Sequence, residues 1–209
     1  RDVLGSRGLG DVYKRQHKKE QRKKIIVTTT RWIVEIGAVI LIAFLIVHFC
    51  LIRHTVVDSS MDNAIPNNQD VVISKGSYLI FSPKRFDVIA FTRTDDTVLM
   101  DEPLTMIRRV IGLPGEKVQI KEGCVYINRK KLEEKYAMEP MKSGGLTEAE
   151  ITLGKDEYFV LGDNRNDSED SRFRSFGNVK EENITGKVIF KLDSFGLIGG
   201  PEVKKEEEN

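Results

Sequence analysis

The sequence predicts a mainly β protein, with its strands in an antiparallel sheet or barrel, that follows one N-terminal transmembrane helix. Two observations carry this prediction. A long apolar run occupies residues 32–52, and after His54 the sequence changes to short runs rich in Val, Ile, Phe and Tyr that turn-forming residues separate. With 209 residues, 40% of them hydrophobic, and 2 Cys, the chain has room for one domain and is not collagen-like, low-complexity or disulfide-rich.

Charge divides the chain into three segments, although the net charge is only +1. Residues 1–31 carry +7, residues 32–54 carry 0 and residues 55–209 carry −6. Because the largest segment is acidic, we expect no nucleic-acid-binding surface. Residues 1–16 have no hydrophobic period, and we expect them to be a remnant of cloning or sequence assembly outside the fold. Residues 17–31 form a basic segment that is typical of the cytoplasmic side of a membrane anchor.

The apolar run over residues 32–52 is interrupted only by Glu35 and His48. A helix over this run is about 31 Å long, which matches a hydrocarbon core of about 30 Å. It is longer than the apolar part of a cleaved signal and has no small-residue exit site. The basic residues before it predict a single-pass protein of the plasma membrane, with a cytoplasmic N-terminus and an extracytoplasmic domain. We expect Glu35 to reach the headgroups; an intramembrane functional carboxylate is the alternative.

The segment after the span is predicted to be the β domain, over residues 55–195. Its strands are expected in the runs 70–75, 87–91, 108–120, 124–132, 156–164 and 184–192. Leu113-Pro114-Gly115-Glu116 and Gly162-Asp163-Asn164 are turn signals between such runs. Residues 196–209 are expected to be a polar, frayed tail.

The positions of His and Cys in the sequence limit the catalytic and metal-binding chemistry that this domain can use. The three His residues are His17, His48 and His54, which lie in the tail, the span and the membrane edge, so a Ser-His-Asp triad is not expected. Cys50 lies in the span and Cys124 in a predicted strand. This distribution argues against a zinc site, a structural disulfide and a Cys nucleophile with a His partner. A Ser or Thr with another base, or a pair of carboxylates, remains for hydrolysis.

Three stretches follow the anchor in a distinctive order: Asp58-Ser59-Ser60-Met61, then MIRRVIGLPGE over residues 106–116, then GDNRNDSEDSR over residues 162–172. Together with KRFDVIAF over residues 84–91, they resemble type I signal peptidase, a family of membrane-bound serine proteases that remove signal peptides from exported proteins. The resemblance covers about residues 32–195. The RVIGLPGE and GDNR…SEDSR segments are its most specific parts.

The resemblance implies roles for residues of the first and last stretches. Ser60 maps to the nucleophile, whose own backbone N–H helps to hold the oxyanion. Ser168 maps to the serine that supports the catalytic base. Asp170 and Arg172 map to a pair that buttresses the site, and Asp163 belongs to the same turn; a surface ion pair is the alternative for Asp170 and Arg172.

The resemblance also implies the substrate. It would be a secreted preprotein whose signal peptide ends in a small-x-small pattern, cut near the membrane surface. The pockets for small side chains are expected to involve Met61 and the strand residues Asp87, Val88, Ile89 and Phe91. The other expected partner is the lipid bilayer, and no metal or organic cofactor is implied.

The sequence departs from the family at the position of the general base. The family has a lysine there, four residues before the first Gly of the G-x-P-G turn, and this chain has Arg108. A buried lysine can be neutral and accept a proton, whereas arginine stays charged. Milder departures are Asp58, where some members have a small or hydroxyl residue, and Asn63 in place of a proline. A negative charge at Asp58 would oppose the developing oxyanion.

Three explanations of Arg108 stay open at this point. The chain is an active peptidase whose base comes from elsewhere, for instance Lys75 or a water. Alternatively, it is a non-catalytic relative that binds exported or pilus-type proteins and assists their assembly. In the third explanation the arginine is a sequence error or a natural polymorphism, because Lys and Arg codons can differ by one base. Comparing cleavage by the chain as written with Ser60→Ala and Arg108→Lys separates the first two.

Overall fold

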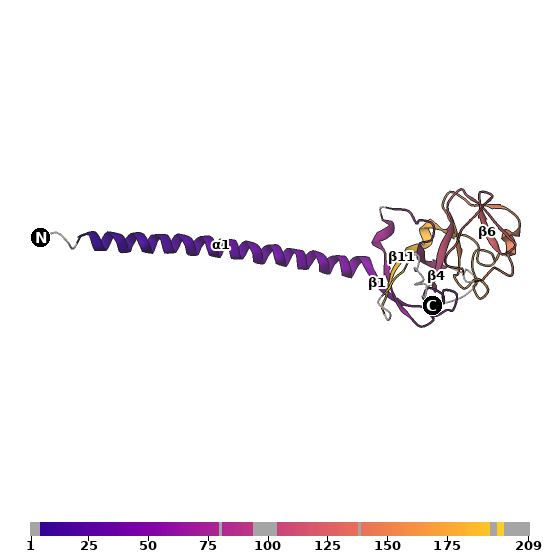
Figure 1. The fold of residues 1–209 in the computed structure, drawn as a ribbon, viewed down its shortest axis with the longest axis horizontal. Helices are drawn as coiled ribbons and strands as arrows, with labels where there is room; N and C mark the ends of the chain where they lie inside the picture. The colour runs from indigo at the N-terminus through magenta and orange to yellow at the C-terminus, as the bar shows by residue number, and fades with distance from the viewer. Residues whose placement is uncertain (1–4, 80, 94–103, 138, 193–195, 199–209) are drawn as a thin grey trace, which may run out of the picture. The chain divides into compact units, whose positions relative to one another are not determined.

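The structure is a computed structural model that describes residues 5–79, 81–93, 104–137, 139–192 and 196–198, with side chains from residue 22 onward. It divides into two compact units, Arg1–Phe49 and Cys50–Asn209. The first is helical, and the regular elements of the second are mainly β-strands (Figure 1).

The first unit is formed by one helix, α1, which spans Gly5–Cys50. It therefore includes residues 5–16, which we expected to lie outside the fold, and it ends two residues before the predicted end of the span. Leu51 and Ile52 belong to β1 instead, because they pair with Ser74 and Ile73. The part Arg22–Cys50 contains an 18-residue stretch with a mean hydropathy of 2.6, and it is long and apolar enough to cross a bilayer. It fits a transmembrane helix.

The described part of the second unit consists of two antiparallel sheets and three short 3₁₀ helices. The larger sheet has the order β1-β2-β11-β3-β4-β9-β10, with β12 beside β11. Its strands are β1 (Leu51–Thr55), β2 (Asp70–Ser74), β3 (Val88–Arg93), β4 (Leu104–Gly112), β9 (Glu157–Leu161), β10 (Val179–Lys180), β11 (Ile184–Lys191) and β12 (Gly196–Leu197). The smaller sheet has the order β7-β6-β5-β8, from β5 (Lys117–Lys121), β6 (Cys124–Ile127), β7 (Lys130–Lys131) and β8 (Ile151–Thr152). The 3₁₀ helices are η1 (Gly76–Tyr78), η2 (Gly145–Glu148) and η3 (Glu181–Asn183).

The prediction of a mainly antiparallel β domain is confirmed, and each of the six predicted runs contains a strand. The barrel is not confirmed, because neither sheet closes on itself among the described strands. The turn predicted over residues 113–116 is present: Gly115 has a φ of 77°, and the Glu116 N–H donates to the Leu113 carbonyl at 3.1 Å. This turn leads the chain from the larger sheet into the smaller one, so the run 108–120 forms two strands.

The tail differs from its expectation at its start. Gly196 and Leu197 form β12 and pair with the end of β11, because Leu197 lies opposite Phe190. Residues 193–195 and 199–209 lie outside the described residues, so the frayed tail remains a prediction for them.

β3 and β4 form the centre of the larger sheet and have apolar clusters on both faces. Val88, Ala90 and Ile107 belong to one cluster, whereas Ile89, Phe91 and Val110 belong to another. Side chains alternate between the faces along a strand. The consecutive residues Arg108 and Arg109 of β4 therefore point to opposite faces, and this alternation organises the site.

Candidate active site

Backbone hydrogen bonds join the loop that carries Ser60 to the loop after β9. The Asn164 N–H donates to the Ser60 carbonyl at 2.9 Å, and the Asn164 side chain donates to the Ser59 carbonyl at 3.2 Å. The Ser59 hydroxyl donates to Asp167 at 2.8 Å. The first and last of the distinctive stretches, more than 100 residues apart in sequence, are thus held side by side.

Ser60 is in contact with a carboxylate rather than with a lysine. Its side-chain hydroxyl donates to Asp58 Oδ1, and its backbone N–H donates to the same oxygen at 3.1 Å. The other oxygen, Asp58 Oδ2, accepts from Arg108 Nη1 at 3.0 Å. Burial tends to raise the pKa of Asp58, but the Ser60 hydroxyl and the Arg108 guanidinium together hold this pKa below its ordinary value. Asp58 is therefore ionised at neutral pH.

Arg108 is held by the backbone as well as by Asp58. Its side chain is only 2% exposed; Nε donates to the Glu169 carbonyl at 2.9 Å and Nη1 donates to the Ile107 carbonyl at 2.7 Å. A guanidinium does not lose its proton in proteins, so Arg108 is a fixed positive charge.

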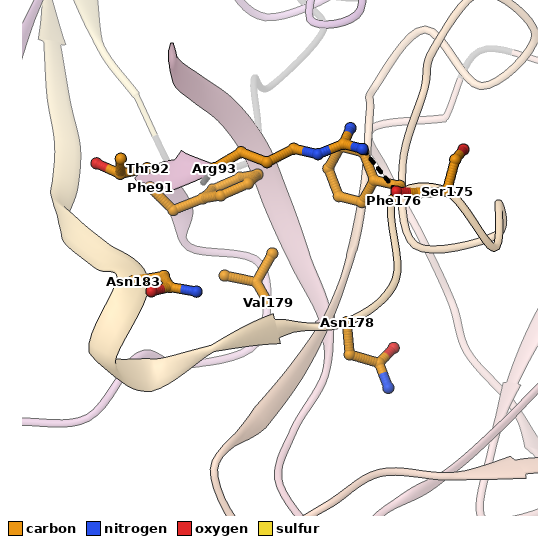
Figure 2. A pocket seen from close by; sticks show the side chains of 8 residues that line it. All are labelled: Phe91, Thr92, Arg93, Ser175, Phe176, Asn178, Val179 and Asn183. Atoms are coloured by element: carbon orange, nitrogen blue, oxygen red, sulfur yellow. Dashed lines mark hydrogen bonds between the residues drawn. The ribbon is translucent and has the colours of Figure 1, made fainter. Parts of the chain in front are cut away.

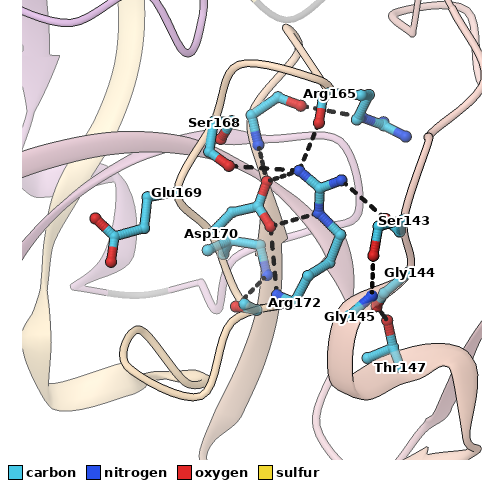
Figure 3. A network of polar contacts seen from close by, with 12 residues as sticks. Ser143, Gly144, Gly145, Thr147, Arg165, Ser168, Glu169, Asp170 and Arg172 are labelled. Carbon is cyan, nitrogen blue, oxygen red and sulfur yellow. Dashed lines mark hydrogen bonds and ion pairs between the residues drawn. The ribbon is translucent and has the colours of Figure 1, made fainter.

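Ser168 differs from Ser60 in the hydrogen bonding of its hydroxyl. Its Oγ is buried and has no hydrogen-bond partner within the part of the chain that the structure describes. Its backbone carbonyl accepts from Arg172 Nη2 at 3.5 Å (Figure 3). The hydroxyl that would support a lysine base is therefore not used by Arg108.

A groove of about 1000 Å³ lies beside Ser60. Asp58, Ser60, Arg108 and Ser168 contribute to its wall. Its apolar surface comes from Val57, Leu104, Met106 and Phe173. The groove is thus a concave site with an apolar wall and a few convergent polar groups, which is typical of a binding or active site.

A buried ion pair supports the groove from the opposite face of β4. Arg109 binds Asp163 in a bidentate manner, at 2.7 Å through Nε and 2.5 Å through Nη2, and both side chains are 1% exposed. Arg109 Nη1 also donates to the Phe86 carbonyl at 2.9 Å, and the guanidinium lies 3.7 Å from the centroid of the Tyr136 ring. This pair fixes the start of the last motif, directly after β9.

A second buried pair holds the last motif together. Arg172 donates to Asp170 at 2.7 and 2.9 Å, and Asp170 also accepts from the Gly162 N–H at 3.2 Å (Figure 3). Arg172 Nη2 donates to the Arg165 carbonyl at 2.6 Å. The side chains of Asp170 and Arg172 are 0% and 4% exposed, so this is not the surface ion pair that was the alternative.

Gly162 lies where the two loops approach most closely. A Cβ atom at this position would lie 2.2 Å from Ser168 Oγ and 2.6 Å from the Ser60 carbonyl oxygen. No side chain fits between them, which explains a glycine at the end of β9.

The five residues expected to bind substrate do not line the groove. Met61, Val88, Ile89 and Phe91 are at most 3% exposed, because the loop after Ser60 packs into the core and β3 is covered by apolar side chains on both faces. Asp87 instead accepts from Lys187 at 2.6 Å and from Tyr78 at 3.1 Å, in a separate pocket.

Phe91 lines another pocket, of about 170 Å³ (Figure 2). There the Arg93 guanidinium lies 5.3 Å from the centroid of the Phe176 ring and donates to the Ser175 carbonyl at 2.6 Å. The neighbouring strand β4 supplies the groove instead, through Leu104, Thr105 and Met106.

The structure also places residues that sequence reasoning put elsewhere. His54 lines the groove, although we expected no histidine at a site in this domain. Lys75 is exposed at the end of β2 and is not among the groove residues. The Asp58–Arg108 and Asp163–Arg109 pairs were missed. The signal that could have found them was the distribution of charge within the three stretches, with Asp58 in the first, two arginines in the second and Asp163 in the third. Among the described residues, no group of three or more His, Cys, Asp or Glu could hold a metal ion.

Comparison with known proteins points to one family. The model of the family described as signal peptidase, peptidase S26, matches residues 29–192. The chain is 34% identical over 134 residues to a probable signal peptidase I-2 of Synechocystis sp., a match that covers 64% of this chain and 59% of that relative. It is 34% identical over 171 residues to signal peptidase I of Leptolyngbya laminosa, covering 79% and 82%, and 30% identical over 181 residues to signal peptidase IB of Staphylococcus aureus (strain COL), covering 78% and 89%.

A solved structure gives a related match. It is the crystal structure of a signal peptidase I from Enterococcus faecalis V583, with 34% sequence identity and a TM-score of 0.41, and the match covers 52% of this chain and 97% of that one. The family match extends from within α1 to the end of β11 and includes all the motif residues of the site. The chain belongs to the signal peptidase family, peptidase S26.

Proposed function

We propose that the chain is a membrane-anchored serine endopeptidase that removes signal peptides from exported preproteins, with Ser60 as the nucleophile. The observation that carries this proposal is the position of Ser60 in the wall of the groove, with its hydroxyl donating to an ionised carboxylate. Membership of the signal peptidase family supplies the reaction class and the substrate class.

The free edge of β4 supports an extended substrate. β4 pairs with β3 from Leu104 to Arg109, but β9 pairs with its other edge only from Arg109 onward. Among the described strands, none covers that other edge between Leu104 and Arg108. An extended peptide can add to an open edge through main-chain hydrogen bonds. Its scissile carbonyl would then lie in the groove beside Ser60, whose backbone N–H would turn to the oxyanion as it forms.

The anchor and the charge distribution support the proposed topology. α1 fits a transmembrane helix, and the +7 segment before residue 32 favours a cytoplasmic N-terminus. We infer a single-pass protein of the plasma membrane whose groove faces the extracytoplasmic side, where signal peptides emerge.

A cleavage assay tests the proposal. The full chain in detergent micelles is mixed with a preprotein whose signal peptide ends in a small-x-small pattern, and product is quantified by gel and mass spectrometry. The chain as written should cleave, and Ser60→Ala should not. Ser77→Ala, in η1 and outside the groove, is the matched control and should cleave at the rate of the unmodified chain.

A second function is favoured by the environment of residue 108. Because Arg108 is a fixed charge and Ser168 Oγ has no partner among the described residues, a non-catalytic relative that binds exported or pilus proteins and assists assembly is the alternative. If the chain as written cleaves no better than Ser60→Ala and yet binds the preprotein, this alternative replaces the peptidase.

A further inference from the structure

Asp58 is the side chain that the Ser60 hydroxyl contacts, and it is fixed in place by Arg108. We propose that Asp58 takes the proton from Ser60 during attack, and that Arg108 is a positioning residue that holds the carboxylate, so that this pair replaces the lysine base. The inference rests on the proposed peptidase function and names the proton acceptor for it.

The contacts of the carboxylate support this role. One oxygen, Oδ1, accepts from the Ser60 hydroxyl and backbone N–H, and the other, Oδ2, accepts from Arg108. Arg108 is itself held by the Glu169 and Ile107 carbonyls. The carboxylate therefore cannot rotate away without breaking bonds at both oxygens. A general base must lie within hydrogen-bond reach of the proton that it accepts, and Asp58 meets this condition.

The proposed reaction balances with water as the only co-reactant. Ser60 Oγ bonds to the scissile carbonyl carbon while its proton passes to Asp58 Oδ1. When the tetrahedral intermediate collapses, the C–N bond breaks and Asp58 returns the proton to the leaving amine. A water then attacks the acyl carbon and gives a proton to Asp58, which passes it to Ser60 Oγ as the ester bond breaks. The products are a free amine and a free carboxylic acid, which then ionises by giving its proton to water or to the amine.

The charge of Arg108 answers the objection that an anion beside the oxyanion would oppose catalysis. The paired guanidinium compensates the charge of Asp58 before reaction, and it stabilises the oxyanion after Asp58 has been protonated. Ser168 Oγ, which has no partner among the described residues, fits the same account, because the hydroxyl that supports a lysine has no function when the proton goes to Asp58.

Restoring a lysine alone should therefore fail to restore a lysine base. In Arg108→Lys the ammonium would lie near the ionised Asp58, and an opposite charge raises the pKa of a lysine. The double change Asp58→Ser with Arg108→Lys removes that charge and rebuilds the serine–lysine arrangement. We expect the double variant to cleave. The acid limb of its pH–rate profile should lie at a much higher pH than the acid limb of the chain as written.

The direct test measures kcat and KM for a peptide that carries the cleavage site, with the full chain in micelles. Asp58→Asn should lower kcat by about 100-fold or more, with KM changed less than about threefold, since a general base contributes about 10²–10⁴ to rate. Asp58→Glu should regain part of the loss. Asp62→Asn is the matched control, because Asp62 lies in the same loop and accepts only from the Asn67 N–H among the contacts described for it.

A pH profile of kcat/KM separates Asp58 from the other groups that face it. Arg108 comes from β4, His54 from β1, and Asp167 and Glu169 from the loop after β9. With Asp58 as the base, activity persists below pH 6. A limb in the range typical of an imidazole would assign the base to His54 instead, and a limb in the range typical of an amine would assign it to a lysine. Arg108→Gln should move the Asp58 limb upward, which a merely structural role would not do.

The outcomes distinguish this inference from the proposed function. If Asp58→Asn keeps its kcat within about twofold while Ser60→Ala is inactive, the Asp58 role is wrong and the peptidase stands. If the chain as written cleaves no faster than Ser60→Ala, the proposed peptidase function is wrong, and the role of Asp58 fails with it. If Asp58→Asn loses activity and its far-UV circular dichroism melt matches the unmodified chain, misfolding is excluded and the assignment is supported.

Discussion

The two sides of the site differ in how completely their charges are paired and buried. On the support side, the Arg109–Asp163 and Arg172–Asp170 pairs are bidentate, and all four side chains are at most 4% exposed. On the reacting side, Arg108 is equally buried, but Asp58 is 40% exposed and Ser168 Oγ has no partner among the described residues. The support side is a closed network, whereas the reacting side leaves one carboxylate open to the groove. Structural charges and reactive charges are thus separated within one small region.

The largest expected effect on stability comes from removing one partner of a buried ion pair on the support side. Arg109→Ala leaves Asp163 buried without its ion-pair partner, and breaking a buried pair costs about 3–5 kcal/mol of unfolding free energy. Urea unfolding of the full chain in micelles, followed by circular dichroism, measures it. A decrease in unfolding free energy of less than about 1 kcal/mol would contradict the importance of this buried pair. Replacing both partners by apolar residues should cost less than the single change, because no buried charge then remains unpaired.

Gly162→Ala acts on the junction between the two sides. The added Cβ must displace Ser168 Oγ and the Ser60 carbonyl, so we expect a loss of about 1–3 kcal/mol in unfolding free energy, together with lower cleavage. Gly76→Ala is the matched control, because its nearest contact is Cys50 Sγ at an ordinary 3.5 Å. Equal melting temperatures for the two variants would show that the close approach at Gly162 relaxes freely.

The reacting side should show a pH dependence of stability from Asp58. Its pKa is lowered in the folded state, so its contribution is present above the unfolded pKa of about 3.9 and is lost as the pH falls through the lower folded value. The difference in unfolding free energy between the chain and Asp58→Asn should therefore be constant from about pH 7 to 5 and shrink below about pH 4. A difference that grows on acidification would reverse the sign of this linkage.

The smallest effect is expected from Ser168→Ala. Removing a buried hydroxyl without a partner leaves the unfolding free energy nearly unchanged or slightly higher. Cleavage should stay within about twofold of the unmodified chain if Asp58 is the base. A large loss of kcat in Ser168→Ala would mean that this hydroxyl has a partner during turnover, and the contrast between the two sides would need revision.

The strands could be predicted because short stretches of the sequence favour a strand or a turn by their own residue types. Runs such as residues 184–192 combine branched and aromatic side chains, and the turn at residues 113–116 combines Pro114 with Gly115. The division into two sheets could not be predicted, because it depends on pairings such as that of β5 with β8 across about thirty residues. The same limit explains the barrel that is not observed.

The site could be predicted as far as its motifs reach. Ser60, Ser168, Asp163, Asp170 and Arg172 come together as their order in the sequence suggested. The pairing of Asp58 with Arg108 joins residues 50 apart and depends on how β4 lies against the loop of Ser60. The residues expected to bind substrate lie outside the groove for a related reason: a strand with apolar side chains on both faces is typical of a sheet interior, and β3 occupies that position.

The two consecutive arginines of β4 differ in what the loss of each charge would leave behind. Arg109 binds Asp163, the Phe86 carbonyl and the Tyr136 ring, so an exchange there affects several elements at once. Arg108 reaches two main-chain carbonyls, one half-exposed acid and the Phe176 ring. The acid partner of Arg109 is buried, whereas the acid partner of Arg108 opens to the groove. Loss of the positive charge at position 109 therefore leaves a buried carboxylate unpaired, and the same loss at position 108 leaves a carboxylate that water can reach.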